Sequence, residues 1–159
     1  MTDIDVTPVQ LCEIEAIKSL KHRYIRAMIT ADWGLFEDCL TADVKTSYSD
    51  GAYTFSDREQ VVAFLRSTHD PAGTSALGYW HVTMPEITLA GDEEASGIWA
   101  MYHFFLDRAG NRQLEMFAYY HDRYRRENGR WKICETGYTR VIEQELDRNT
   151  VPGYQVLVP

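Results

Sequence analysis

Cysteine is scarce in this sequence, with three residues among 159. Cys12, Cys39 and Cys134 are odd in number and show no Cys-x-x-Cys spacing, which argues against a disulfide framework and against a zinc site. We therefore expect reduced thiols and a cytoplasmic location. Because Cys12 and Cys39 fall among apolar residues of helical patterns, we expect both to pack in the core.

Positively charged residues are also few. The sequence has 16 Lys and Arg and 24 Asp and Glu, which gives a formal net charge of −8. Binding to a phosphate backbone needs clustered Lys and Arg, so we expect no nucleic-acid partner. No apolar run is long enough to span a membrane. The N-terminal residues also lack the basic start and the apolar core of a signal peptide.

The motifs of several enzyme classes are missing as well. The sequence has no P-loop, dinucleotide fingerprint or nucleophile elbow, and Gly91, Gly110 and Gly129 fall in turn sequences. His-x-x-x-His is absent, and no carboxylate or Cys lies at ligand spacing from His81 or His103. We therefore expect neither a metal ion nor an organic cofactor.

Helical and strand patterns fill most of the chain, of which 45% is hydrophobic. Apolar residues at three- and four-residue steps predict helices over 8–30, 33–40 and 58–67. Alternating apolar residues between turn sequences predict strands over 44–48, 79–89, 95–106, 113–125 and 130–141. We expect residues 144–159 to form an extended tail, with one helical turn at 143–147.

This order, with three helices around one short strand and then a run of long strands, indicates an α+β fold rather than an alternating βαβ fold. We expect a single domain over residues 1–159, with a core of about 8–143. A curved mixed or antiparallel sheet wrapped over the three helices would form a cone-shaped barrel. The space inside such a cone suits a small apolar ligand.

Four side chains able to exchange protons fall on segments expected to face the interior: Tyr24, Tyr48, His81 and His103. Strand alternation places His81 on one face together with Tyr79 and Thr83. A structural role stays open for each of the four, because buried Tyr and strand His are common where one polar partner is available. The remaining histidines are expected on the surface or in loops: His22, His69 and His121.

Four stretches carry a resemblance to a known superfamily: residues 14–26, 46–51 (Thr-Ser-Tyr-Ser-Asp-Gly), 85–88 (Pro-Glu-Ile-Thr) and 129–140 (Gly-Arg-Trp-Lys-Ile-Cys-Glu-Thr-Gly-Tyr-Thr-Arg). The sequence resembles the SnoaL-like, nuclear-transport-factor-like α+β cone proteins, which include scytalone dehydratase, polyketide cyclases and ketosteroid isomerase. Within this superfamily it is most similar to the bile acid 7α-dehydratases.

The resemblance implies site residues position by position. Tyr24 and Tyr48 match the active-site tyrosines of that family, and His81 matches its catalytic histidine. Arg140 matches its C-terminal active-site arginine.

Two positions depart from the family pattern. Ile29 stands where the family has an aspartate that partners the histidine. His103 stands where the family has a second aspartate. The candidate site residues include two tyrosines and two histidines, and in this composition they are similar to the active site of scytalone dehydratase.

For function, the resemblance implies a cofactor-independent lyase that eliminates water from a hydroxylated steroid of the 7-hydroxy-3-oxo-4-ene bile acid type. His81 would act as base and then as acid, and the neutral phenols of Tyr24 and Tyr48 would donate to oxygens. His103 would orient the hydroxyl or replace the missing carboxylate, and Arg140 would bind substrate. The apolar walls would come from Phe64, Trp80, Trp99 and Tyr120.

Other interpretations stay open at this stage. A ketosteroid isomerase-like or polyketide cyclase-like enzyme fits the same fold, as does a non-catalytic domain that binds a small apolar ligand. Sheet faces in this superfamily often pair between subunits, so we expect a homo-oligomer, either a dimer or a trimer.

Overall fold

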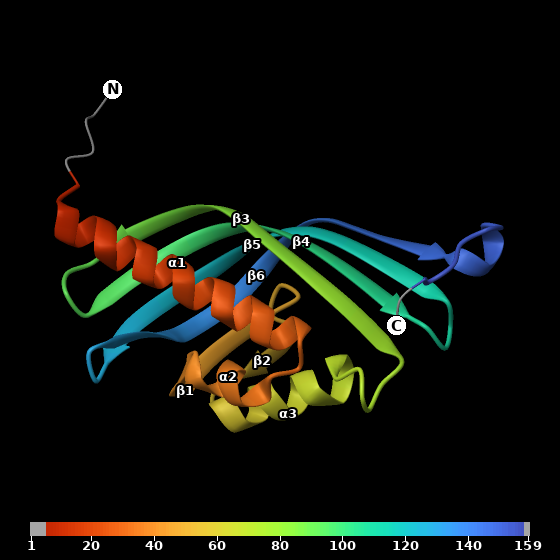
Figure 1. The fold of residues 1–159 in the computed structure, drawn as a ribbon, viewed down its shortest axis with the longest axis horizontal. Coiled ribbons are helices and arrows are strands. Elements are labelled where there is room, and N and C mark those ends of the chain that lie inside the picture. Colours follow the sequence, from red (N-terminus) through yellow and green to blue (C-terminus); the bar gives the residue numbers. More distant parts are fainter. Residues whose placement is uncertain (1–5, 158–159) are drawn as a thin grey trace.

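The computed structural model describes residues 6–157. Figure 1 shows long strands arching over the helices. In chain order the elements are α1 (Pro8–Ile29), α2 (Trp33–Asp38), β1 (Leu40–Tyr48), β2 (Tyr53–Phe55), α3 (Arg58–His69), β3 (Ala76–Leu89), β4 (Glu94–Asp107), β5 (Arg112–Glu127), β6 (Arg130–Asp147) and the 3₁₀ turn η1 (Arg148–Thr150).

Local capping explains where the helices begin. Thr7 and Gln10 form a capping box at the start of α1, with Pro8 in the first turn. The carboxylates of Asp32 and Asp57 accept backbone N–H bonds at the starts of α2 and α3. The helix predictions are therefore close, although α2 ends two residues earlier than expected and α3 continues two residues further.

The strands form one six-stranded sheet in the order β2-β1-β6-β5-β4-β3. Neighbouring strands are antiparallel except β1 and β6, which run parallel, so the sheet is mixed. Gly137 permits that parallel pair, since a Cβ there would lie 2.4 Å from the carbonyl oxygen of Ser47. This arrangement confirms the predicted α+β cone of a curved mixed sheet over three helices.

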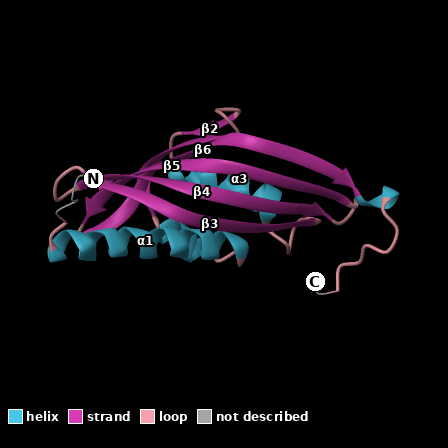
Figure 2. Cartoon of the chain, turned by 90° about the horizontal axis from the view of Figure 1, so that it is seen from above, coloured by secondary structure: helices cyan, strands magenta, loops and turns pink. Residues whose placement is uncertain are grey.

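The helices cover one face of the sheet, with α1 packed against β3 and α3 against β1 and β3 (Figure 2). Along β5, Met116, Ala118 and Tyr120 are buried under the helices, while Phe117 and Tyr119 are exposed on the opposite face. This two-residue alternation defines an inner face and an outer face of the sheet along β5.

Several sequence predictions of local structure are wrong. β6 continues through Asp147, so residues 143–147 are strand and not a helical turn. The helical turn lies later, in η1. β1 begins at Leu40 instead of 44, and the short strand β2 was not predicted. Cys39 is buried as expected, but Cys12 is exposed.

None of the helices within residues 6–157 is long and apolar enough to cross a membrane.

Candidate active site

A cavity of about 260 Å³ opens between α3, the β1–β2 connection and the inner faces of β3 to β6. Its walls are mainly aromatic and apolar, and two imidazoles, four phenols and one carboxylate interrupt them. The residues that matter for its chemistry are Tyr48, Tyr53, Phe64, Thr68, His69, Trp80, His103, Tyr120, Tyr138 and Glu143. A concave apolar site with few converging polar groups is the usual form of a small-molecule site.

The hydroxyl of Thr68 determines the tautomer of His69. Thr68 Oγ1 donates to the carbonyl oxygen of Phe64 at 2.9 Å and lies 2.6 Å from His69 Nδ1. Because the hydroxyl proton is directed to the carbonyl, the oxygen accepts from an Nδ1–H group. The lone pair of His69 is therefore on Nε2.

His103 lies deeper in the same wall. Its ring stacks on Trp80 with centroids 4.2 Å apart and an interplanar angle of 11°, and it lies 6.2 Å from the ring of His69. Both ring nitrogens are buried and have no hydrogen-bond partner among residues 6–157. Buried polar atoms are nearly always paired, so these two nitrogens are unusual and mark His103 as a candidate functional residue.

Gly78 makes this stacking sterically possible. A Cβ at this position would lie 2.6 Å from Cη2 and 2.7 Å from Cζ3 of Trp80. The indole of Trp80 therefore leans along β3 over Gly78, two residues earlier on the same face, and covers His103.

Burial keeps both imidazoles neutral. Desolvation lowers the pKa of His69 to about 4. Desolvation and, to a lesser extent, the neighbouring His69 ring lower the pKa of His103 to about 3. At neutral pH each ring carries one donor and one acceptor nitrogen.

The wall opposite is phenolic. The hydroxyls of Tyr24 and Tyr48 are hydrogen-bonded at 3.1 Å, and Tyr48 stacks on Tyr138 with centroids 5.8 Å apart. The Tyr138 hydroxyl is paired with that of Ser49 at 2.9 Å. Desolvation raises the pKa of Tyr24, Tyr48 and Tyr120, so these phenols remain protonated hydrogen-bond donors.

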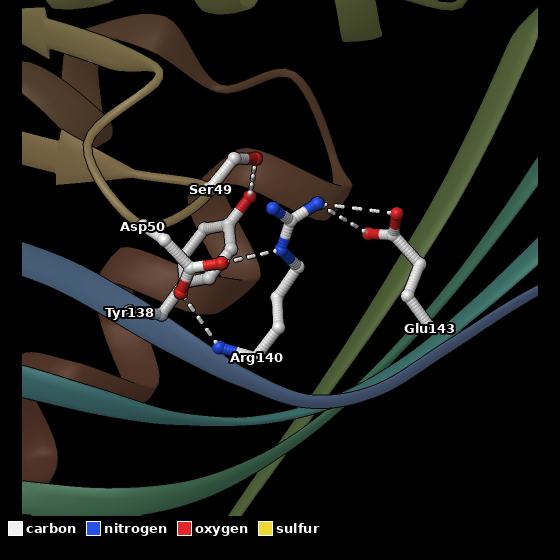
Figure 3. Close-up of polar contacts among 5 residues, drawn as sticks. All are labelled: Ser49, Asp50, Tyr138, Arg140 and Glu143. Atoms are coloured by element: carbon white, nitrogen blue, oxygen red, sulfur yellow. Dashed lines mark hydrogen bonds and ion pairs between the residues drawn. The ribbon is translucent and has the colours of Figure 1, made fainter.

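Charged groups meet beside the cavity residues Ser49, Tyr138 and Glu143 (Figure 3). Asp50 accepts from the backbone N–H of Arg140 at 3.0 Å and from its Nε at 2.7 Å, and Arg140 Nη1 donates to Glu143 at 3.2 Å. These bonds lower the pKa of Asp50 and raise that of Arg140. Asp50 lies in a tight turn of left-handed residues, with φ of 50° at Ser49, 58° at Asp50 and 92° at Gly51.

The structure brings together most of the residues singled out from the sequence. Five of them line the cavity: Tyr48, Phe64, Trp80, His103 and Tyr120. Tyr24 and Arg140 do not line the cavity, but they are hydrogen-bonded to Tyr48 and Glu143, which do. Trp99 does not reach the cavity, because it is fully buried in the core, where its Nε1 donates to the hydroxyl of Tyr124.

His81 also lies outside the cavity, and the prediction of an inward face for His81 and Tyr79 is wrong. Both side chains are exposed, whereas Trp80 between them is buried. His81 pairs with Tyr102, which belongs to the outer face, while Trp80 pairs with the inward His103. Paired residues of neighbouring strands share a face, so His81 lies outside the cavity. It borders a shallow hollow between α1 and β3 that also contains Ile29.

His69, Thr68 and Tyr138 are cavity residues that the sequence interpretation missed. His69 was expected in a loop, but it is the last residue of α3. A signal for it exists, since Val61, Leu65 and His69 follow one another at four-residue steps and thus lie on the same helix face.

Within residues 6–157, no three His, Cys, Asp or Glu side chains converge in a way that could hold a metal ion.

Comparison with known proteins identifies related folds. A family model described as SnoaL-like domain matches residues 9–137. A hexachlorocyclohexane dehydrochlorinase (LinA) Type2 is 17% identical with a TM-score of 0.79, covering 94% of this chain and 96% of that chain.

Two further solved structures are similar. A provisionally named scytalone dehydratase from Novosphingobium aromaticivorans is 15% identical with a TM-score of 0.76, covering 92% of this chain and 90% of that chain. ActVI-ORFA from Streptomyces coelicolor is 13% identical with a TM-score of 0.66, covering 80% of this chain and 96% of that chain. At these identities the similarity concerns the fold.

Proposed function

Because the chain belongs to the SnoaL-like domain family, we propose that it is a lyase that removes water from a small apolar hydroxy-ketone without a cofactor. The observation that carries this proposal is the pair of buried neutral imidazoles, His69 and His103, in a largely apolar and phenolic cavity. Two similar structures are named as a dehydrochlorinase and a scytalone dehydratase, and both names describe eliminations.

His69 is the base in this proposal. Its Nε2 takes the proton from the carbon between the ketone and the carbinol carbon. The electron pair of that C–H bond passes toward the ketone and forms an enolate. As the ketone re-forms, the enolate electron pair becomes the new C=C bond and the C–O bond breaks. Imidazolium then returns the proton to the departing hydroxide, which leaves as water, so His69 ends neutral.

The low pKa of His69 is compatible with this role. Desolvation disfavours imidazolium in the empty cavity, so the ring is unprotonated and ready at neutral pH. An enolate that develops beside the ring is an opposite charge, and opposite charges favour imidazolium. The base is therefore strengthened as the reaction proceeds.

The other polar groups are assigned to the two substrate oxygens. His103 binds the leaving hydroxyl, since its two unpartnered nitrogens offer one donor and one acceptor. Tyr48 and Tyr120 donate to the ketone oxygen, where negative charge accumulates once the proton is removed. Arg140, which donates to the cavity residue Glu143, is assigned to an anionic or polar end of the substrate.

Cavity size favours a substrate of one or two rings. Its volume of about 260 Å³ lies below the roughly 300–1,000 Å³ of pockets for drug-sized ligands. A four-ring steroid of the 7-hydroxy-3-oxo-4-ene type is the finer alternative from the family resemblance, and it would have to extend through the mouth past Glu143.

Mass spectrometry of reaction mixtures tests this proposal. Purified protein is incubated with a bicyclic hydroxy-ketone of the tetralone type and with a 7-hydroxy-3-oxo-4-ene steroid. We expect loss of one water from the bicyclic compound. An isomerase would leave the substrate mass unchanged, and a binding domain would retain the ligand without turnover.

Variants then test the assignment of the base. His69→Ala is expected to lower kcat by about 10²–10⁴-fold, the usual contribution of a general base. His81→Ala is the matched control, because the same substitution on an exposed histidine outside the cavity should leave kcat unchanged. The reverse pattern, with activity lost only in His81→Ala, would contradict the assignment.

A further inference from the structure

A fully buried ammonium group lies behind the phenolic wall of the cavity. Lys21 on α1 and Asp122 on β5 are both 0% exposed, and Nζ lies 2.7 Å from Oδ2 of the carboxylate. Asp122 also accepts from Thr136 at 2.7 Å and from Tyr124 at 2.9 Å. The carboxylate is thus held from three sides, and it fixes the position of the ammonium group.

The other close neighbours of the ammonium group are aromatic rings. Lys21 Nζ lies 3.6 Å from the ring centroid of Tyr120 and 4.9 Å from that of Tyr24. Tyr120 lines the cavity, and its hydroxyl has no hydrogen-bond partner within the described part of the chain. Tyr24 is hydrogen-bonded to Tyr48, which also lines the cavity.

Stability alone gives little reason for this pair. Two charges lose their hydration on burial, and neutral residues of similar volume are often as stabilising as a buried ion pair. The pKa of Lys21 is lowered, because desolvation outweighs the opposing effect of the Asp122 carboxylate, which favours the charged form. Buried charged groups with shifted pKa values are common beside active sites, where the charge influences the reaction in the neighbouring cavity.

We propose that Lys21, held by Asp122, is a positioning residue that polarises the Tyr120 ring and makes the phenolic wall electropositive, so that the wall stabilises an enolate oxygen. A cation against a phenol ring withdraws electron density from it and strengthens its hydroxyl as a donor. This inference rests on the proposed function, because the enolate is its intermediate.

The test measures the charge state of a bound probe. The probe is 2-naphthol, a bicyclic phenol whose neutral and anionic forms differ in absorbance. We compare the pH at which bound naphthol ionises in the wild type and in the double variant Lys21→Met/Asp122→Asn. The double change removes both charges together, so neither is left buried and unpaired.

We expect the apparent pKa of bound naphthol to rise by about one unit in the double variant, which is a tenfold loss of preference for the anion. With substrate, kcat should fall 10- to 100-fold while KM stays near the wild-type value. Circular dichroism and thermal melting establish that the variant is folded. An unchanged naphthol pKa in the folded variant would overturn the inference.

A matched control is the pair Lys132 and Asp38, which are 2.9 Å apart and border no part of the cavity. Lys132→Met/Asp38→Asn should leave the naphthol pKa unchanged. If the Lys21 double variant does not fold, Tyr120→Phe gives a second test, since loss of its hydroxyl should also raise the pKa of bound naphthol. An unchanged value there would equally contradict the inference.

Naphthol titration needs no turnover, so its outcome is separate from that of the proposed function. A rise in the naphthol pKa without any dehydration would support the electropositive wall and contradict the lyase. Dehydration with an unchanged naphthol pKa would support the lyase and contradict the role of Lys21.

Discussion

One hydroxyl group orients the proposed base. Thr68 accepts from Nδ1–H of His69 and directs its own proton to the Phe64 carbonyl, which leaves Nε2 of His69 as the acceptor. Without that bond the imidazole can rotate or change tautomer, and only part of the population would present a lone pair to the substrate.

We therefore predict that Thr68→Val lowers kcat about 10- to 100-fold with little effect on KM, because the ring is misoriented but the cavity is kept. Steady-state kinetics measures both constants. Thr68→Ser retains the hydroxyl and should keep at least half of the wild-type kcat. Equal losses in the two variants would mean that the hydroxyl is not what matters.

The buried imidazoles also predict how stability depends on pH. The folded-state pKa values of about 4 for His69 and about 3 for His103 lie below the ordinary histidine pKa of 6.5. The unfolded chain therefore binds more protons below pH 6.5. The stability that comes from keeping these rings neutral is complete above 6.5 and is lost as pH falls toward 4 and 3.

We predict that His103→Phe, which stacks on Trp80 without titrating, weakens this acid destabilisation. Between pH 6.5 and 4 the wild type should lose roughly 1–3 kcal/mol more unfolding free energy than the variant. Urea denaturation at several pH values measures the difference. Parallel pH profiles would show that His103 is not held neutral by burial.

At the level of single residues, the sequence predicts inward phenols better than inward histidines. Tyr24 lies on a clear apolar stripe, so its burial could be predicted. β3 carries aromatic residues on both faces, Tyr79 outward and Trp80 inward, so alternation alone does not tell the faces apart. A shift of one residue reverses every side chain of a strand, which is why His81 was placed inside.

Among the elements, β3 contains a single small residue on which its packing depends. Gly78 leaves room for the Trp80 indole, which in turn covers His103. We predict that Gly78→Ala destabilises the protein by about 1–3 kcal/mol and displaces this indole, since overpacking forces a shift of neighbouring atoms. Urea denaturation and naphthol affinity measure the two effects.

Gly73→Ala is the control for that change. This loop glycine would place its Cβ in open space and has no positive φ, so the same substitution should be neutral or slightly stabilising. If both variants lost stability equally, the contact with Trp80 would not be the cause.

The ends of the long strands show what local patterns do not reveal. Residues 142–147 include Glu143, Gln144, Glu145 and Asp147, and polar residues of this kind have low strand propensity. They are strand because β5 pairs with them up to Arg112 and Asp147. That pairing is a property of the whole sheet and leaves no trace in the local sequence. β2, with three residues, is too short to give a pattern.

At the scale of the whole molecule, the order of elements is sufficient to predict the fold class, since helices followed by long strands indicate an α+β cone.

The outer face of the sheet is not covered by any helix or loop of the described chain. It exposes the apolar side chains Phe117, Tyr119 and Ile142. Contiguous exposed apolar residues of this kind are typical of an association surface.

We predict a homo-oligomer that associates through this outer face. Phe117→Lys/Tyr119→Lys should reduce the mass measured by light scattering to that of one chain, because two charges would have to be buried. Val9→Lys is the control, an exposed apolar residue on α1 where the same change should not alter the mass. A wild type that is already monomeric would contradict the prediction.

The parallel pairing of β1 with β6 has a consequence for how the protein forms. β1 ends at Tyr48, and its neighbour β6 begins at Arg130, so the first strand made finds its principal partner only when the last one has been synthesised. Contacts so distant in sequence slow folding, because a long loop must close first. During synthesis the apolar surfaces of β1 and α1 would therefore stay exposed until β6 has been made. The cavity would form in the last step of folding.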